Sequence, residues 1–191
     1  MKLPEIIGVA GTNASGKNTL GDVLVADFGY SQVSTGDMVR AEAMKQFGDI
    51  ERATLQKVAP AYKRQHGAGV FVELALQQPR PLVIDGIRAL GEAKMIKKAG
   101  GVLVFVDADP ELRYQRMKKR ARDAESQKSF EEFLQLDQNE WEAGPDDSDY
   151  NIKGIKAMAD ISLTNDGTVE EFTKKALAAL EQQQTNTELT D

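Results

Sequence analysis

A glycine-rich loop that contains one lysine carries the clearest chemistry in this sequence. Residues 11–19 read Gly-Thr-Asn-Ala-Ser-Gly-Lys-Asn-Thr and directly follow the apolar run 6–10. Two glycines let the backbone curl so that successive N–H groups converge on an anion, and Lys17 adds a mobile positive charge. The positive end of the following helix dipole strengthens this field. The pattern predicts a loop that binds a nucleoside triphosphate through Gly11, Thr12, Asn13, Ala14, Ser15, Gly16, Lys17, Asn18 and Thr19.

The end of this loop departs from the usual G-x4-G-K-[ST] pattern at one position. Asn18 stands where a hydroxyl side chain usually contacts the metal, and Thr19 follows one residue later. The alternative interpretation is a glycine-rich turn with a chance lysine. The apolar run before the loop and the helical pattern after it favour phosphate binding.

Length and composition narrow the class of protein. The chain has 191 residues, of which 41% are hydrophobic, which suits one globular domain with a real core. A formal net charge of -6 argues against a general nucleic-acid binder, so we expect a small anionic ligand. There is no cysteine for a disulfide or a cysteine-based metal site. No signal-like or membrane-spanning window is present, so a cytoplasmic monomer or dimer that binds neither membrane nor nucleic acid is the default expectation.

Apolar runs and helical patterns alternate along the chain, as in parallel α/β proteins. Beyond the run 6–10, short buried strands are expected at 30–34, 82–84, 102–106 and 161–164. Helices are expected at 17–27, 37–46, 51–78 with a break at 67–69, 90–98, 110–122, 130–141 and 169–182. The sequence therefore predicts a single three-layer α/β domain with a five-stranded parallel sheet, helices on both faces and a disordered tail over 184–191.

A second motif, residues 34–40, reads Ser-Thr-Gly-Asp-Met-Val-Arg. It resembles the Ser-Thr-Gly-Asp-Met-Leu-Arg segment of adenylate kinases and related nucleoside monophosphate kinases, which have the P-loop kinase fold. The resemblance implies that Thr35 lies near the acceptor nucleoside and that Arg40 holds its phosphate. A hydroxyl and a guanidinium fork suit these roles. The alternative is helix capping by Thr35 or Asp37, which would not by itself require Arg40.

A third motif, residues 83–88, reads Val-Ile-Asp-Gly-Ile-Arg and looks like the Asp-Gly-Phe-Pro-Arg strand end of the same family without its proline. A carboxylate at the carboxyl end of a parallel strand beside the phosphate loop is the expected partner of hydrated Mg²⁺, which points to Asp85. By resemblance, Asp37 shares the water shell of the metal, and Arg88 holds the phosphate between donor and acceptor. Alternatively, Asp85 is a turn residue before a glycine.

Glu92 stands where the adenylate kinase pattern has a glutamine that reads the acceptor adenine. An ionised carboxylate only accepts hydrogen bonds, so it could pair with an amine of the acceptor base but could not donate to that base. A solvated residue in the first turn of a helix is the alternative. The identity of the acceptor base therefore stays open.

A basic stretch at 113–122 contrasts with the acidic character of the chain. Arg116 and Arg120 are four residues apart and share one helix face. In the nucleoside monophosphate kinases a similar helix leads into the lid, and the resemblance implies that Arg116 and Arg120 act on the donor base or the transferring phosphate. Arg122 would add a contact when the lid closes. Such runs are otherwise solvated helix faces.

The segment 159–168 reads Ala-Asp-Ile-Ser-Leu-Thr-Asn-Asp-Gly-Thr. It resembles the last strand and turn of dephospho-CoA kinases and of an archaeal group related to adenylate kinases, in which the turn lies beside the donor adenine. The archaeal group also carries the Asp-Gly-Ile-Arg motif and the basic helix, and the resemblance covers most of the chain. The stretch 143–157 is longer than that group leads us to expect.

These motifs together predict a P-loop kinase that transfers a phosphoryl group from ATP-Mg²⁺ to a nucleoside monophosphate. The expected catalytic side chains are Lys17, Arg88, Arg116, Arg120 and Arg122. Helices over 37–78 would cover the acceptor, and a short lid would span 116–145. A dephospho-CoA kinase, suggested by the final turn, and a nucleotide-binding switch with slow ATPase activity are the alternatives.

Overall fold

A five-stranded parallel sheet forms the centre of the structure, a computed structural model that describes residues 1–120, 128–142 and 144–189. The strand order is β2-β3-β1-β4-β5. The strands are β1 (Ile6–Gly11), β2 (Ser31–Ser34), β3 (Leu82–Ile87), β4 (Val102–Asp107) and β5 (Ile161–Thr164). Strand β1 is buried along its whole length because helices cover both faces of the sheet. The predicted fold class is confirmed.

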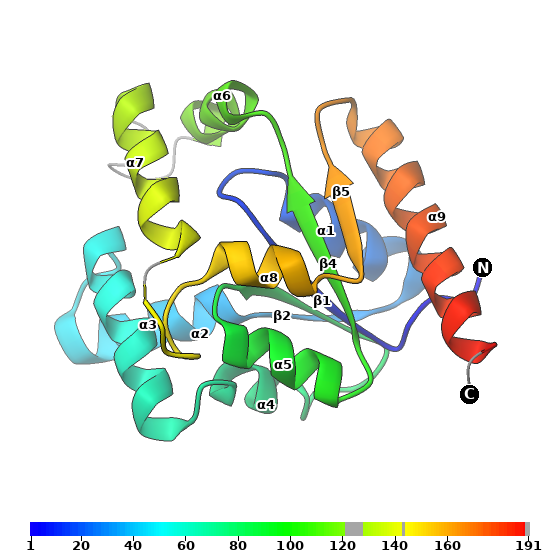
Figure 1. The fold of residues 1–191 in the computed structure, drawn as a ribbon, viewed down its shortest axis with the longest axis horizontal. Helices are drawn as coiled ribbons and strands as arrows, with labels where there is room; N and C mark the ends of the chain where they lie inside the picture. Colours follow the sequence, from blue (N-terminus) through cyan, green and yellow to red (C-terminus); the bar gives the residue numbers. More distant parts are fainter. Residues whose placement is uncertain (121–127, 143, 190–191) are drawn as a thin grey trace.

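Helices pack on both faces of this sheet (Figure 1). They are α1 (Lys17–Phe28), α2 (Thr35–Phe47), α3 (Arg52–His66), α4 (Val70–Ala75), α5 (Leu90–Lys98), α6 (Pro110–Arg120), α7 (Phe130–Trp141), α8 (Ile152–Met158) and α9 (Val169–Glu188). Leu24 of α1 and Phe172 of α9 belong to one apolar core, whereas Ile96 of α5 and Ile155 of α8 belong to the core on the opposite face. Helices α6 and α7 lie at the top of Figure 1, toward which β4 and β5 point. Among the described residues, no helix has both the length and the apolarity needed to cross a membrane.

The order of the strands places the glycine-rich loop in the middle of the sheet. Strand β1 lies between β3 and β4, so the loop that follows it reaches the edge where both neighbours also end. Ser34 is in register with Asp85, which brings the second and third motifs to the same edge. In open α/β sheets, ligands bind outside the carboxyl ends of the strands at such a point.

Helix α8 (Ile152–Met158) begins within the stretch 143–157, which is longer than expected. Ile152 and Ile155 are buried in the core, and Asn151 caps the helix by accepting a hydrogen bond from the Gly154 N–H (2.7 Å). Two buried side chains are too few to produce a recognisable helical period, which explains why the sequence pattern did not predict this helix.

Helix α9 corrects the expectation of a disordered tail from residue 184. The helix continues to Glu188, and Gln184 Nε2 donates to Glu188 Oε1 (2.8 Å). Lys2, near the other end of the chain, forms an ion pair with Glu188. Side-chain pairs four residues apart can stabilise the end of a helix that has no apolar residues. The polar composition of this segment therefore gave no sign that the helix continues.

Candidate active site

Two glycines shape the loop between β1 and α1. Gly11 ends β1 with a φ of 144°, and a Cβ atom at this position would lie 1.9 Å from the carbonyl oxygen of Val106. Gly16 precedes α1 with a φ of 93°. Both conformations favour glycine, because a Cβ atom would be strained there. The loop therefore curls at the amino end of α1, where N–H groups and the helix dipole suit an anion.

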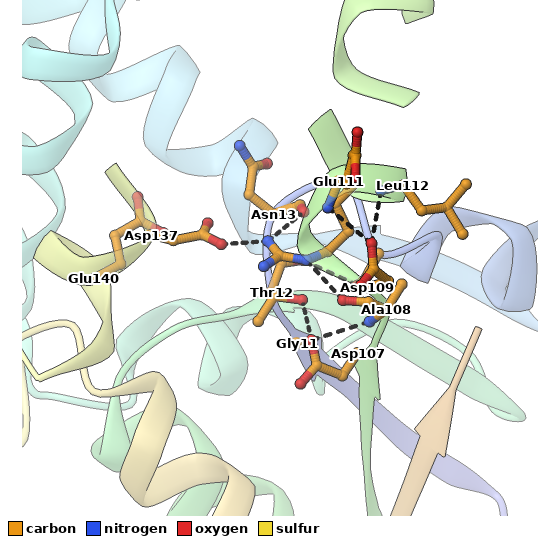
Figure 2. Close-up of polar contacts among 12 residues, drawn as sticks. Gly11, Thr12, Asn13, Asp107, Ala108, Asp109, Glu111, Leu112, Asp137 and Glu140 are labelled. Atoms are coloured by element: carbon orange, nitrogen blue, oxygen red, sulfur yellow. Dashed lines mark hydrogen bonds and ion pairs between the residues drawn. The ribbon is translucent and has the colours of Figure 1, made fainter. Parts of the chain in front are cut away.

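Asp107 at the end of β4 anchors the start of the loop. Thr12 Oγ1 donates to Asp107 Oδ1 (2.7 Å), as Figure 2 shows, and Lys156 of α8 donates to Asp107 Oδ2 (3.1 Å). Burial raises the pKa of Asp107, but these two contacts and the N–H of Ala108 outweigh burial and hold the pKa below its ordinary value. An ionised Asp107 therefore fixes Thr12. No sequence motif includes Asp107.

Two further side chains hold the loop by its carbonyl oxygens. Asn165 Nδ2, in the turn after β5, donates to Ser15 O (2.8 Å), and Arg113 Nη1 of α6 donates to Asn13 O (3.2 Å). These contacts join the loop to residues 150 and 100 positions away. The resemblance placed the turn of Asn165 beside the donor adenine, whereas the structure shows its amide on the loop itself.

The ammonium group of Lys17 lies on the same loop. Its Nζ donates to the carbonyl oxygens of Gly11 (3.1 Å) and Thr12. The flexible four-carbon stem lets the ammonium group exchange such neutral acceptors for a phosphate oxygen. The positive charge is therefore held beside the expected phosphate position.

A cavity of about 1080 Å³ opens at this edge of the sheet. Its volume is slightly above the range of about 300–1,000 Å³ that is usual for one small-molecule site. The predicted residues that line it are Asn13, Ala14, Ser15, Gly16, Lys17, Asn18, Thr19, Thr35, Asp37, Arg40, Asp85, Arg88, Glu92 and Arg116. The structure thus brings the phosphate loop, the second and third motifs and the basic stretch into one cavity, whereas no residue of the segment 159–168 is among those that line it. Arg120 ends α6, and Arg122 lies outside the described residues.

A smaller polar hollow of about 340 Å³ lies between the loop and the second motif. It is lined by Asn18, Gln32, Ser34, Asp37, Arg40 and Asp85. Asp85 is buried near the carboxyl end of β3, and Gln32 Nε2 donates to its Oδ2 (2.9 Å). In the part of the chain that the structure describes, no three His, Cys, Asp or Glu residues gather as a metal cluster. The residues fit a hydrated Mg²⁺, which would rely on Asp85, water and phosphate oxygens.

The second motif places a hydroxyl and a guanidinium at the start of α2. Thr35 is buried, and Gly86 approaches it so closely that a Cβ atom there would lie 2.8 Å from Thr35 Oγ1. Ser34 occupies the cap position of α2 and its side chain makes no capping bond, so capping by Thr35 or Asp37 is not what this helix shows. Arg40 forms an ion pair with Asp37. Both side chains of this pair line the cavity.

Glu92 has a structural role that corrects the interpretation of a solvated residue in the first turn of a helix. Its side chain is 2% exposed, and Oε2 accepts from the backbone N–H groups of Arg88 (2.9 Å) and Ala89 (3.0 Å). Lys63 of α3 forms an ion pair with Oε1 (3.2 Å). Glu92 thus satisfies the start of α5 and neutralises a buried lysine. The carboxylate is therefore not solvated, and contact with an acceptor base stays a prediction.

Glu140 of α7 binds two arginines that face the cavity. It forms ion pairs with Arg52 of α3 and with Arg88, which follows β3, and Gln56 Nε2 donates to Oε1 (3.4 Å). Burial raises the pKa of Glu140, but Arg88 and Arg52 outweigh burial and hold the pKa below its ordinary value. Arg52, Gln56 and Glu140 belong to no motif. The one available signal is that Glu140 falls seven residues after the buried Phe133, on the apolar face of α7.

The two arginines of α6 described at this site differ in their surroundings. Arg113 is buried, forms an ion pair with Asp137 of α7 and lies 5.3 Å from the ring centre of Phe133. Arg116 lines the cavity, and its buried Nη1 has no hydrogen-bond partner among the described residues. A buried donor without a partner is unfavourable unless a ligand supplies an acceptor. Arg113 therefore supports the loop, whereas Arg116 is available to an anion.

Comparison with known sequences agrees with this geometry. Residues 7–137 match a family model described as an AAA domain. A UPF0200 protein of Thermococcus gammatolerans is 33% identical, over 92% of this chain and 94% of its own. A UPF0200 protein of Thermococcus kodakarensis is 32% identical, over 87% of this chain and 91% of its own. The chain belongs to the UPF0200 family and to this AAA-domain family.

Solved kinase structures share the fold of this UPF0200 family member. Shikimate kinase from Bacteroides thetaiotaomicron matches with a TM-score of 0.65 and 14% identity, over 93% of this chain and 99% of its own. A gluconokinase from Sinorhizobium meliloti matches with a TM-score of 0.59 and 20% identity, over 100% of this chain and 99% of its own. At these identities the likeness establishes a P-loop kinase-like fold and leaves the acceptor open.

Proposed function

We propose that this protein transfers the γ-phosphoryl group of ATP-Mg²⁺ to a nucleoside monophosphate. One observation supports the proposal most strongly. A single cavity is lined by the phosphate loop, by Arg40 and Arg88 of the two acceptor motifs, and by Arg116 with its buried nitrogen. Convergence of cations on one space beside a phosphate loop is what transfer between two phosphates requires.

Each side chain would act through charge and position. Loop N–H groups and Lys17 would bind the donor phosphates, and Asp85 would orient the water shell of Mg²⁺, which supplies positive charge when bound. Arg40 and Arg88 would hold the acceptor phosphate, and Arg116 would neutralise charge on the transferring group. An acceptor phosphate is already ionised at neutral pH, so the reaction needs no general base.

Two other functions make different demands on the cavity. A dephospho-CoA kinase is favoured by the turn that contains Asn165, whose resemblance extends to that family. A nucleotide-binding switch with slow ATPase activity would use only the phosphate loop and the metal position. Both alternatives leave the Ser-Thr-Gly-Asp motif and Arg40 without a function, which is why we favour a monophosphate acceptor.

A panel of acceptors with ATP-Mg²⁺ tests the proposal. It contains each ribo- and deoxyribonucleoside monophosphate, dephospho-CoA, and the shikimate and gluconate named for the solved neighbours. We expect a nucleoside diphosphate to form from at least one monophosphate. Phosphorylation of dephospho-CoA alone would select the second candidate, and ATP hydrolysis with no phosphorylated acceptor would select the switch.

Lys17→Ala should lower turnover of the accepted substrate by about 100-fold or more, because a preorganised charge at the transferring phosphate is lost. Lys174→Ala, on an exposed position of α9, is the matched control and should keep wild-type turnover. Steady-state rates at saturating ATP measure both variants. A fully active Lys17→Ala protein would contradict the assignment of the loop.

A further inference from the structure

Three donor side chains converge on the buried carboxylate of Glu140. Arg52 and Gln56 come from α3, one helical turn apart, and Arg88 comes from the end of β3. The side chains of Arg52 and Arg88 are 17% and 25% exposed, and that of Glu140 is 5% exposed. All four residues line the cavity. Guanidinium and amide donors arranged in this way fit the oxygens of a phosphate as well as those of a carboxylate.

The charges of this cluster favour a ligand with more than one negative charge. In the ion pairs described here, the two guanidinium groups of Arg52 and Arg88 share the single carboxylate of Glu140. Tyr150 beside Arg88 does not change this balance, because burial raises the pKa of its phenol to about 12. A phosphate monoester carries a charge of about -1.5 to -2 at pH 7 and would neutralise both arginines. A ligand with a single carboxylate carries the same charge as Glu140, so it would only replace that side chain with an equivalent group.

Helix α7, which carries Glu140, contacts both sides of the cavity. Asp137, one turn before Glu140, forms an ion pair with Arg113, whose guanidinium also donates to Asn13 of the phosphate loop. Figure 2 shows the Asp137 carboxylate directed toward the loop at Asn13, with Glu140 on the same helix. One carboxylate of α7 therefore serves the donor side and the other the acceptor side.

We propose that Arg52 and Gln56 join Arg40 and Arg88 in the subsite for the phosphate group of the acceptor. Glu140 fills this subsite as an internal competitor, which the acceptor displaces. The inference rests on the proposed phosphoryl transfer. It adds Arg52 and Gln56, which lie outside every motif, to the residues that bind the acceptor phosphate, and it gives Glu140 the role of an internal competitor. Displacement of Glu140 also separates the carboxyl end of α7 from α3, so acceptor binding changes the contact between these helices.

Inorganic phosphate is the probe for this subsite. Calorimetry measures its affinity for the whole chain while a non-hydrolysable ATP analogue with Mg²⁺ saturates the phosphate loop. Loss of an internal competitor raises the fraction of protein that is ready to bind, so Glu140→Gln should bind phosphate at least about tenfold more tightly than wild type. Glu142→Gln is the matched control, because Glu142 is exposed and pairs with Lys153 (2.8 Å). Equal affinity of wild type, Glu140→Gln and Glu142→Gln would overturn the proposal.

Arg52→Gln tests the subsite without altering Glu140. The variant removes a charged donor from the cluster, and we expect phosphate to bind at least about tenfold more weakly. Arg64→Gln is the control on the same helix, since Arg64 pairs with Asp149 and is not among the residues that line the described cavity. Unchanged phosphate affinity in Arg52→Gln would reject Arg52 as a ligand even if the Glu140 variant did not fold.

The panel of acceptors tests the kinase, and the phosphate titration tests the subsite, so each proposal can be rejected without the other. A response of phosphate affinity to Glu140→Gln with no acceptor phosphorylated would support the subsite and reject the kinase. A phosphorylated monophosphate whose affinity responds to neither Glu140→Gln nor Arg52→Gln would support the kinase and reject the subsite.

Discussion

The proposed donor and acceptor sides of the cavity are held by different kinds of interaction. On the donor side, Thr12 and Ser15 are fixed by Asp107 and Asn165, and the loop takes its shape from Gly11 and a second glycine. Its N–H groups are part of the backbone and need no movement to meet an anion. On the acceptor side, the cations are long side chains held by carboxylates. Glu140 of α7 holds Arg52 and Arg88, and Asp37 holds Arg40.

This difference follows from the cost of burying charge. Backbone N–H groups at a helix end carry only partial charges, so they can lie at the site without a bound anion. The guanidinium groups of Arg52 and Arg88 are half-buried and both positive, so they would repel each other without an anion. Each would also be an unpaired buried charge, which is strongly unfavourable. The donor side can therefore accept phosphate as it stands, whereas the acceptor side must exchange one anion for another.

Gly11→Ala is the change that should disturb the donor side most. The added Cβ meets the carbonyl of Val106 in a left-handed backbone, so we expect a loss of about 3 kcal/mol in the free energy of unfolding and loss of ATP binding. Gly29→Ala has a φ of 69° with nothing within 4 Å, so it isolates backbone strain at about 1 kcal/mol. Urea unfolding and ATP titration measure both. Retained ATP affinity in Gly11→Ala would show that the loop is not preorganised.

Glu140→Ala should disturb the acceptor side next. Removing one partner of the buried cluster should cost about 2 kcal/mol in the free energy of unfolding, less than for a fully buried pair because Arg52 and Arg88 keep some exposure. Millimolar phosphate should restore part of this loss, since a ligand that binds the native state stabilises it. Urea unfolding with and without phosphate tests this, with Glu142→Ala as control. Equal losses in both variants would mean that Glu140 does not hold the arginines.

Asn165→Ala should affect the donor side and not the acceptor side, and its effect should be smaller than those of the two variants above. Loss of the bond to Ser15 should cost about 1 kcal/mol in the free energy of unfolding and weaken ATP binding several-fold. Phosphate affinity at the acceptor side should not change, because Asn165 does not line the described cavity. Calorimetric titration of each ligand tests this, and a parallel fall in both affinities would show that the two sides are coupled.

Acid should weaken both sides, with little effect near neutral pH. Asp107 and Glu140 have pKa values below their ordinary values of 3.8 and 4.5. A depressed pKa stabilises the fold fully above the ordinary value, and this stabilisation is lost as the pH falls through the folded-state pKa. The free energy of unfolding should therefore be level between pH 6 and 5 and fall below about pH 4.5.

Two variants show which carboxylate causes the fall in the free energy of unfolding at low pH. Thr12→Val removes one of the groups that lower the pKa of Asp107, the others being Lys156 and a backbone N–H. Glu140→Gln removes the carboxyl that faces Arg88, Arg52 and Gln56 and should flatten the pH dependence by its own share. Urea unfolding from pH 6 to 3.5 measures each slope. A steeper acid loss in Glu140→Gln than in wild type would contradict a lowered pKa for Glu140.

The donor side could be predicted from sequence because its chemistry lies in nine consecutive residues that follow an apolar strand. The carboxyl ends of parallel strands meet at one edge, so Asp85 and Arg88 could also be placed near the loop without a structure. Single residues within a strong motif were less predictable. Glu92 matched a family position, but Lys63 from a distant helix and two local N–H groups bind it instead.

The acceptor side could not be predicted to the same extent. Arg52 and Glu140 are 88 positions apart, and only the packing of α3 beside α7 joins them. Each is an ordinary charged residue in its own segment, and ion pairs leave no periodic pattern in a sequence. Helix α8 was missed for a related reason, since two buried isoleucines carry too little pattern.

The bond between Asn165 and Ser15 also bears on how the chain acquires its activity. A chain that ends before β5 contains every motif of the phosphate loop and both acceptor segments, yet it lacks the contact that fixes the loop from 150 positions away. Contacts of such long range form late, after the intervening chain has closed a large loop. Nucleotide affinity would therefore rise several-fold when the last strand docks, so a bound nucleotide would favour the fully folded domain.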